Sequence, residues 1–261
     1  MNKIDNSVYL QFARAEYTSA VDGLRDWYLF RPGNARLCVV VLHGHGSQGD
    51  ELVTEHWRER LRDWHECLNE LDASVLCPNL RDNSWMSASA VADFAALLRQ
   101  LKARHPWEQL VIASGSMGGT GALIFASRHP ELVDGVVALG AAAAMPHYAE
   151  WCAQPGRLPV CGRILEAIRA AYPTPESLAA HDVCAHADSL RMPVLFYQGA
   201  ADEVIPASEA IDLAERLKDK SDFHLTLVPD GNHDSPLHYF REGLTRILAI
   251  LGAKDVSKQS T

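Results

Sequence analysis

The sequence predicts an α/β fold, in which helices flank a mostly parallel sheet of about eight strands. Three observations lead to this prediction. Short apolar runs alternate with longer segments of helical period, as in successive β–α–β units. The run Cys-Val-Val-Val-Leu at 38–42 is apolar throughout, as in a strand that is covered on both faces. No internal repeat or low-complexity linker divides the 261 residues, so a single domain over 1–261 is expected.

The elements follow from local patterns. Residues 8–17 and 25–30 predict an antiparallel pair at one edge of the sheet, because the turn sequence Asp22-Gly23 lies between them. Further strands are indicated by short apolar runs, and helices by apolar residues at intervals of three or four. In chain order the later elements are strand 38–42, helix 57–71, strand 74–77, helix 91–101, strand 110–113, helix 118–127, strands 135–139 and 194–197, helix 207–217, strand 224–228 and helix 236–251.

One connection is several times longer than usual. It separates Leu139 from Val194 and follows the carboxyl end of a strand, where ligands bind in sheets of this kind. We therefore predict that residues 143–190 form a small helical cap that contributes to a substrate pocket. The alternative is an elaborated pair of surface helices. The polar segment 254–261 is predicted to be a flexible tail.

Composition excludes several classes of protein. Lysine and arginine total 24 and aspartate and glutamate total 33, which gives a net charge of −9 and disfavours binding to nucleic acid. No apolar run approaches the roughly 20 residues of a membrane span. Residues 1–6 lack the apolar segment of a secretory signal, so a cytoplasmic protein is expected.

The six cysteines form no C-x-x-C pair and are expected to be reduced and mostly buried. The sequence leaves a homodimer open.

The strongest local motif is Val-Ile-Ala-Ser-Gly-Ser-Met-Gly-Gly-Thr-Gly at 111–121. A buried strand that enters a glycine-rich turn and then a helix is the context of a nucleophile elbow, in which a strained serine lies between small residues. Ser116 has Ser114 two positions before it and Gly118 two positions after it. Ser114 is a poorer candidate, because Ile112 would occupy its small position. We predict that Ser116 is a nucleophile; an ordinary glycine-rich turn is the alternative.

A second motif, His-Gly-His-Gly-Ser at 43–47, follows the strand at 38–42. Acyl transfer requires N–H donors at the place where negative charge develops on the carbonyl oxygen. The predicted donors are the backbone N–H groups of Met117 and His45. The H-x-H spacing also occurs in metal sites, but no third ligand stands nearby with metal spacing, so no metal is expected.

A serine nucleophile requires a base, which is itself oriented by an acid. In sheets of this kind the order along the chain is serine, acid, histidine, each on a loop after a strand. Asp202 follows strand 194–197, and His233 follows strand 224–228. The order predicts Asp202 as the acid and His233 as the base, while the adjacent Glu203 is expected to point to solvent.

With these motifs the sequence resembles the α/β-hydrolase fold serine hydrolases, from Asp22 to about Leu251. The segment around 22–32 is also similar to esterases of the prolyl oligopeptidase and dienelactone hydrolase branches. Ser114 departs from the glycine that is usual at that position. No propeller domain precedes the segment, which weakens the peptidase interpretation. The resemblance is carried by H-G-H-G at 43–46, S-G-S-M-G at 114–118, G-A-A-D-E-V-I-P at 199–206 and G-N-H at 231–233.

The resemblance implies a carboxylesterase that cleaves a small or medium acyl ester through an acyl-enzyme on Ser116, without a metal or organic cofactor. A serine peptidase, an amidase or a thioesterase would use the same triad. A non-catalytic protein that binds small molecules would keep the same fold.

Substrate-binding residues are expected after the strand at 74–77. Trp85 is predicted to wall a subsite and Arg81 to meet a substrate carboxylate. A packed tryptophan with a solvated arginine is the alternative. The net charge of −9 disfavours a strongly anionic substrate unless a cation such as Arg81 compensates.

Overall fold

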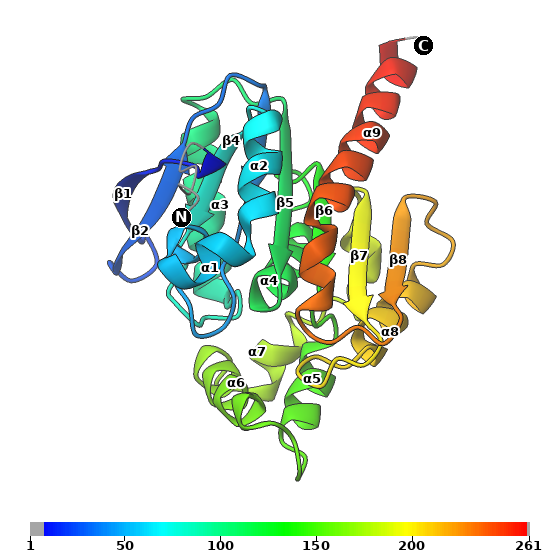
Figure 1. Cartoon of the computed structure of the whole chain (residues 1–261). Coiled ribbons are helices and arrows are strands. Elements are labelled where there is room, and N and C mark those ends of the chain that lie inside the picture. Colours follow the sequence, from blue (N-terminus) through cyan, green and yellow to red (C-terminus); the bar gives the residue numbers. More distant parts are fainter. Residues whose placement is uncertain (1–7, 260–261) are drawn as a thin grey trace, which may run out of the picture.

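The computed structural model describes residues 8–259, with 254–259 described by their backbone alone. Eight strands form one sheet in the order β1-β2-β4-β3-β5-β6-β7-β8 (Figure 1). β1 and β2 pair antiparallel, as do β2 and β4, and all other pairs are parallel. The predicted fold class is confirmed. The strands are β1 Ala13–Thr18, β2 Arg25–Arg31, β3 Leu37–Val40, β4 Ser74–Pro78, β5 Gln109–Gly115, β6 Gly135–Leu139, β7 Val194–Gly199 and β8 Phe223–Val228.

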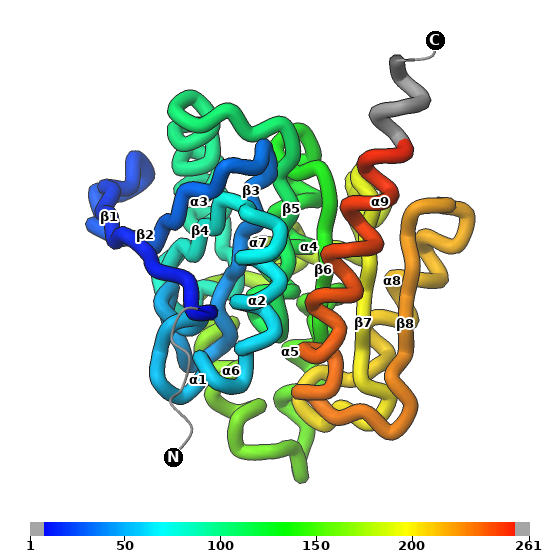
Figure 2. Tube along the Cα trace, turned by 45° about the horizontal axis from the view of Figure 1, so that its top comes forward, coloured from blue at the N-terminus to red at the C-terminus, as the bar shows by residue number. Residues whose placement is uncertain are grey.

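Helices cover both faces of the sheet. The α-helices are α1 Glu55–Arg60, α2 Arg62–Glu70, α3 Ala88–Lys102, α4 Met117–Arg128, α5 Met145–Cys152, α6 Pro159–Ala171, α7 Pro175–Ala179, α8 Ser208–Arg216 and α9 Phe240–Gln259. The 3-10 helices that the structure describes in full are η2 Glu51–Val53, η3 Ala187–Ser189 and η4 Ser235–Tyr239. α2 and α9 lie on one face, and α3, α4 and α8 lie on the other (Figures 1 and 2).

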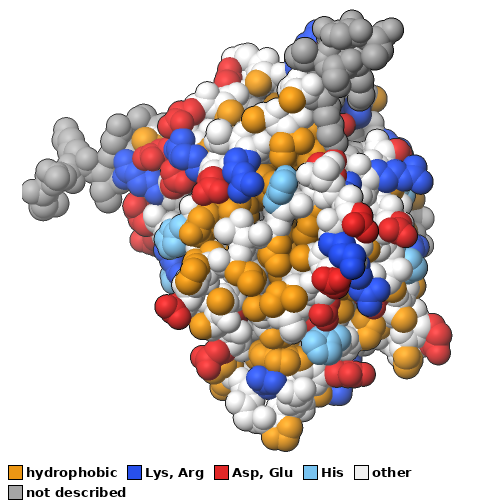
Figure 3. Space-filling view, turned by 90° about the vertical axis from the view of Figure 1, so that its right-hand side faces the viewer, with side chains coloured by type: hydrophobic (Ala, Val, Ile, Leu, Met, Phe, Trp, Pro, Cys, Tyr) orange, Lys and Arg blue, Asp and Glu red, His pale blue; other side chains and the backbone are white. Residues whose placement is uncertain are grey.

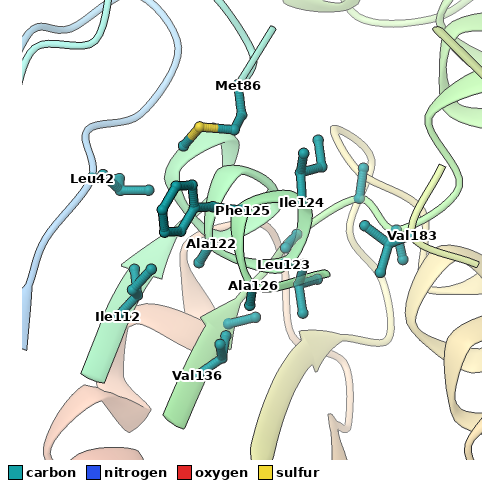
Figure 4. Close-up of a cluster of buried hydrophobic side chains, with 14 of the residues drawn as sticks. Leu42, Met86, Ile112, Ala122, Leu123, Ile124, Phe125, Ala126, Val136 and Val183 are labelled. Atoms are coloured by element: carbon teal, nitrogen blue, oxygen red, sulfur yellow. The ribbon is translucent and has the colours of Figure 1, made fainter. Parts of the chain in front are cut away.

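Each face has its own apolar core. On the first face Trp64 of α2 stacks on Phe240 of α9, with ring centroids 4.0 Å apart. On the second face α4 is buried along most of its length. Its Phe125 and neighbouring side chains pack near Ile112 and Val136 of the central strands (Figure 4). The central strands β3, β5 and β6 are covered on both faces, which explains their continuous apolar runs.

The long connection between β6 and β7 forms α5, α6 and α7, which gather beyond the carboxyl ends of the strands (Figure 1). Its first residues are held by a buried carboxylate. The N–H groups of Ala143 and Ala144 donate to Glu209 Oε2 of α8 over 3.1 and 2.7 Å, and His147 Nδ1 donates to Oε1 over 2.6 Å. The insertion therefore lies at the carboxyl edge of the sheet, and its role as a cap over a substrate pocket stays a prediction.

The helix predicted over 57–71 is divided in the structure. α1 ends at Arg60 and α2 begins at Arg62, while Leu61 between them has φ −101° and ψ 21°. Leu61 is buried, and its N–H still bonds to Trp57 O over 2.8 Å. Because apolar residues keep their helical spacing through the break, periodicity does not reveal it.

The two ends of the chain also differ from the prediction. The first strand begins at Ala13 rather than at residue 8, because residues 8–12 pack on α2, where the Leu10 N–H donates to His65 Nδ1 over 3.1 Å. The last helix starts as η4 and continues as α9 to Gln259, into the segment 254–261 predicted to be a tail. No proline ends the helix there. Residues 260–261 lie outside the described residues.

The sheet ends at β8. Leu227 of this strand is 40% exposed, and Ile211 of α8 beside it is 45% exposed. Figure 3 shows this side of the molecule, where hydrophobic side chains lie between charged ones. A homodimer stays a prediction. None of the described helices is both long and apolar enough to cross a membrane.

Candidate active site

Ser116 lies at the sharp turn between β5 and α4. Its backbone has φ 55° and ψ −128°, a conformation that a residue with a Cβ rarely adopts. The turn brings the chain against the end of β3: a Cβ at Gly118 would lie 2.2 Å from Leu42 O. Only glycine fits at 118, so the small residue after the serine is a steric requirement.

Ser114 explains the departure from glycine at the first small position. Its side chain is completely buried, and its Oγ accepts the N–H of Leu42 over 2.8 Å. This bond links β5 to the start of the loop at 43–47. The Ser114 hydroxyl therefore satisfies the buried N–H of Leu42. A glycine at 114 has no side chain to do so.

The three residues predicted from different strands lie together. The Nδ1–H of His233 donates to Asp202 Oδ2 over 2.8 Å, since an ionised carboxylate only accepts. Nε2 is then free to accept the hydroxyl proton of Ser116, whose Oγ lies 2.9 Å away. Ser116, His233 and Asp202 thus form a continuous hydrogen-bonded chain.

The Asp202 carboxylate is buried and fully engaged. Its Oδ1 accepts the N–H groups of Val204 and Ile205 over 2.8 and 3.0 Å. Its Oδ2 accepts Gln198 Nε2 over 3.1 Å in addition to the histidine. The sequence analysis did not identify Gln198. The only sequence feature that could have indicated its contact with Asp202 is its place at the end of β7, four residues before that acid. These bonds hold the carboxylate in one orientation.

The loop at 43–47 is held by two side chains and by one backbone bond of its own. Glu51 Oε2 accepts the Gly44 N–H over 3.0 Å, and Asn83 Oδ1 accepts the Gly46 N–H over 2.7 Å. The Ser47 N–H donates to Gly44 O over 3.2 Å. Within the described residues no partner is found for the His45 N–H. It is therefore available to donate to a ligand.

The N–H of Met117 is the first of α4, and the first donors of a helix have no partner within it. It directly follows Ser116 and lies at the positive end of the helix dipole. His45 lines the same cavity as Ser116, and the role of both N–H groups as oxyanion donors stays a prediction.

Trp85 occupies a different place from the one predicted. It is completely buried behind the 43–47 loop, with its ring 6.0 Å from that of His45 and 5.7 Å from that of Tyr148 in α5. Its carbonyl accepts the Tyr172 hydroxyl over 2.6 Å. Trp85 is not among the described residues that line the cavity at Ser116. It supports the loop and the cap from behind, so its expected role as a wall of the substrate site is corrected.

Arg81 is also displaced from its predicted role. Its Nε donates to Asp93 over 2.7 Å, and its Nη1 donates to Asp22 over 2.8 Å. Nη2 bonds to Ser19 Oγ over 2.8 Å. These partners come from the β1–β2 turn and from α3, and they hold the pKa of Arg81 above its usual range. The guanidinium is a structural tie between these elements and does not line the cavity at Ser116.

A cavity of about 170 Å³ opens beside Ser116 and His233. Its walls are mainly apolar and come from α1, α2, the cap helix α6 and η4. Burial lowers the pKa of His45 and raises the pKa of Glu51, the polar side chains beside the loop. The lining consists of Gly44, His45, Glu51, Trp57, Leu61, Trp64, Gly115, Ser116, Val160, Ile164, Val204, His233, Asp234 and Leu237.

The comparisons with known proteins agree with this fold. The family model described as alpha/beta hydrolase fold matches residues 38–179, more than half of the chain. The chain therefore belongs to the α/β-hydrolase fold family. No curated protein matches it.

Several solved structures have a similar fold. FphF, a fluorophosphonate-binding serine hydrolase from Staphylococcus aureus, is 17% identical with a TM-score of 0.67, covering 92% of this chain and 98% of its own. The esterase Pf2001 from Pyrococcus furiosus is 16% identical with a TM-score of 0.67, covering 97% and 96%. Est1E from Butyrivibrio proteoclasticus is 17% identical with a TM-score of 0.65, covering 91% and 99%. At these identities the likeness concerns the fold.

Proposed function

We propose that this protein is a serine hydrolase that cleaves the carboxylic ester of a small or medium acyl substrate through an acyl-enzyme on Ser116. The observation that carries the proposal is the hydrogen-bonded chain from Ser116 through His233 to Asp202. This chain begins at a strained turn and opens on a mainly apolar cavity. Membership of the α/β-hydrolase fold family and a fold shared with esterases agree with the proposal.

In the first half-reaction His233 Nε2 takes the proton of Ser116 while Oγ forms a bond to the acyl carbon. The carbonyl oxygen gains negative charge, and the N–H groups of His45 and Met117 donate to it. His233 then gives its proton to the departing alcohol oxygen as the ester C–O bond breaks. Asp202 holds the imidazole tautomer and stabilises its charged form.

In the second half-reaction a water molecule replaces the alcohol. His233 removes one of its protons, and the hydroxide oxygen bonds to the acyl carbon. Collapse of the intermediate breaks the bond to Oγ, and His233 returns the proton to Ser116. The side chains named here supply every proton transfer in both halves.

Labelling with a fluorophosphonate probe tests the nucleophile. We expect the wild-type protein to be labelled and Ser116→Ala not to be. Ser127→Ala is a matched control, because Ser127 lies in α4, the helix that follows Ser116, and its hydroxyl donates to Ile124 O. Labelling that persists in Ser116→Ala would contradict the assignment.

A second experiment separates the ester reaction from its alternatives. Hydrolysis of p-nitrophenyl esters of increasing acyl length is compared with hydrolysis of aminoacyl amides and thioesters. We expect the esters to be preferred and the rates to fall once the acyl chain exceeds the cavity. Faster turnover of amides or thioesters would assign the protein to a peptidase, amidase or thioesterase function. Inactivity on all substrates would favour a non-catalytic binding protein.

A further inference from the structure

Among the described residues that line the cavity, Glu51 is the one carboxyl group that belongs neither to the triad nor to an ion pair. It belongs to η2, just beyond the 43–47 loop, and lines the same cavity as Ser116. Its Oε2 accepts the Gly44 N–H over 3.0 Å. A carboxylate oxygen has a second lone pair, so this bond leaves the group able to accept from a ligand.

The surrounding charges leave Glu51 without a basic partner. The described residues that line the cavity include no lysine and no arginine. The other acid, Asp234 at the mouth, is paired with Arg60 over 2.7 Å, so that arginine is already compensated. Arg163 is exposed on α6, where its charge acts on His45.

The basic side chain whose charge acts on Glu51 is His43. Its ring nitrogens lie 2.8 Å from Asn79 O and 2.9 Å from Gly44 O, so the ring is held away from the cavity. A cation in the cavity would therefore meet Glu51 without displacing an existing Lys or Arg.

The environment of Glu51 amplifies its preference for a cation. The cavity walls are mainly apolar, with the aromatic rings of Trp57 and Trp64 among them. Burial in such surroundings raises the pKa of Glu51, and the hydrogen bonds from Gly44 and Ser47 oppose this shift only in part. A protonated amine would restore its charge balance, whereas a second carboxylate would add like-charge repulsion. Aromatic rings also attract ammonium groups.

We propose that Glu51 is a specificity-determining residue, through which the cavity selects a protonated amine carried on a short apolar group over a carboxylate in the same place. This inference deepens the proposed function. It rests on that function where it assigns the amine to the substrate of the hydrolase. An apolar cavity of about 150 Å³ is large enough to bind benzene. The cavity of about 170 Å³ at Ser116 therefore has room for a short chain or a single ring.

Three ligands of equal length test the charge preference: n-hexylamine, hexan-1-ol and hexanoate. Their affinities for wild-type protein are measured by inhibition of a neutral p-nitrophenyl ester, and for Ser116→Ala by titration calorimetry. We expect the amine to bind at least about tenfold more tightly than hexanoate, as one charge-assisted hydrogen bond would provide. Equal affinities would overturn the inference.

Two variants localise the effect. In Glu51→Gln the amide oxygen still accepts the Gly44 N–H, so we expect hexan-1-ol binding to stay within about twofold while the preference for the amine is lost. Glu55→Gln removes the same charge from an exposed position in α1 and should keep the preference. If Glu51→Gln weakens all three ligands equally, Glu51 only holds the loop and the inference is wrong.

The two proposals fail in distinguishable ways. Absence of Ser116-dependent turnover would contradict the proposed hydrolase. The calorimetric comparison in Ser116→Ala requires no turnover and still decides whether Glu51 selects the amine. Conversely, turnover of the neutral ester without any charge preference would keep the hydrolase and remove the role of Glu51.

Discussion

Asp202 carries the most hydrogen bonds of the three triad residues. Its carboxylate accepts from two backbone N–H groups, from Gln198 and from His233. The backbone donors cannot rotate away, so they hold both oxygens in one orientation. The acid is therefore a fixed acceptor that decides which nitrogen of His233 carries the proton.

We expect Asp202→Asn to lower kcat by about 10⁴-fold, because an amide at this position favours the wrong histidine tautomer. KM for a p-nitrophenyl ester should change much less, since Asp202 does not line the cavity. Steady-state kinetics at pH 7 measure both constants. Glu203→Gln is the matched control, because this exposed neighbour should leave the rate near that of wild type. A near-normal rate for Asp202→Asn would assign the acid role elsewhere.

Residue types in chain order predicted Ser116, Asp202 and His233, because the sheet topology requires each to follow a different strand. The same reasoning failed for Arg81 and Trp85. Both follow a strand at the edge of the sheet where the triad lies. The local sequence does not show that Asp93 and Asp22 bind the arginine in place of a substrate carboxylate. Partners that are distant in the chain decided both positions.

At the scale of elements, one buried side chain of α8 holds the start of the predicted cap. Glu209 is completely buried in α8 and accepts the N–H groups of Ala143 and Ala144, where the chain leaves β6 for the cap. Burial raises its pKa, while these donors and His147 oppose that shift. The cap helix α6 in turn supplies Val160 and Ile164 to the cavity.

We expect Glu209→Ala to lower the free energy of unfolding by roughly 3 kcal/mol, because it leaves buried N–H donors without an acceptor. Urea unfolding followed by circular dichroism measures the loss. Glu215→Ala on the same helix removes an exposed pair with Lys218 and should change stability by less than about 0.5 kcal/mol. Equal effects of the two substitutions would show that Glu209 does not anchor the cap.

Patterns of apolar residues predicted most elements to within a few positions, and strand β6 at 135–139 in full. They did not predict the break at Leu61 or the extension of α9 to Gln259. Periodicity reports which face of a segment is buried. It does not report where a helix must bend to pack against a neighbour, because that depends on the neighbour's surface.

At the scale of the whole molecule, the six cysteines are free and buried. Burial raises the pKa of Cys67 to about 11 and those of Cys152 and Cys184 to about 12. It also raises the pKa values of the other three thiols, Cys38, Cys77 and Cys161. The folded protein thus keeps thiol protons that the unfolded chain releases above about pH 9.

We therefore expect the free energy of unfolding to fall as pH rises above about 9, by up to about 1.4 kcal/mol per pH unit for each thiol. Below about pH 8 the thiols are protonated in both states and contribute no slope. Thermal unfolding between pH 7 and 10.5 in the presence of a reductant measures the effect. Cys184→Ala should show a shallower fall than wild type. A midpoint that is constant over this range would contradict the prediction.

By itself, the sequence determined the fold class, the order of the strands and helices and the three residues of the candidate triad. These depend on short-range patterns and on the rule that parallel strands end at one edge of the sheet. Only the tertiary structure decided that Arg81 is a structural tie, that Trp85 lies behind the loop, and that Gln198 and Glu51 adjoin the site. Each of these depends on which polar groups meet after folding, and a buried polar group takes the partner that the packing brings within hydrogen-bonding distance.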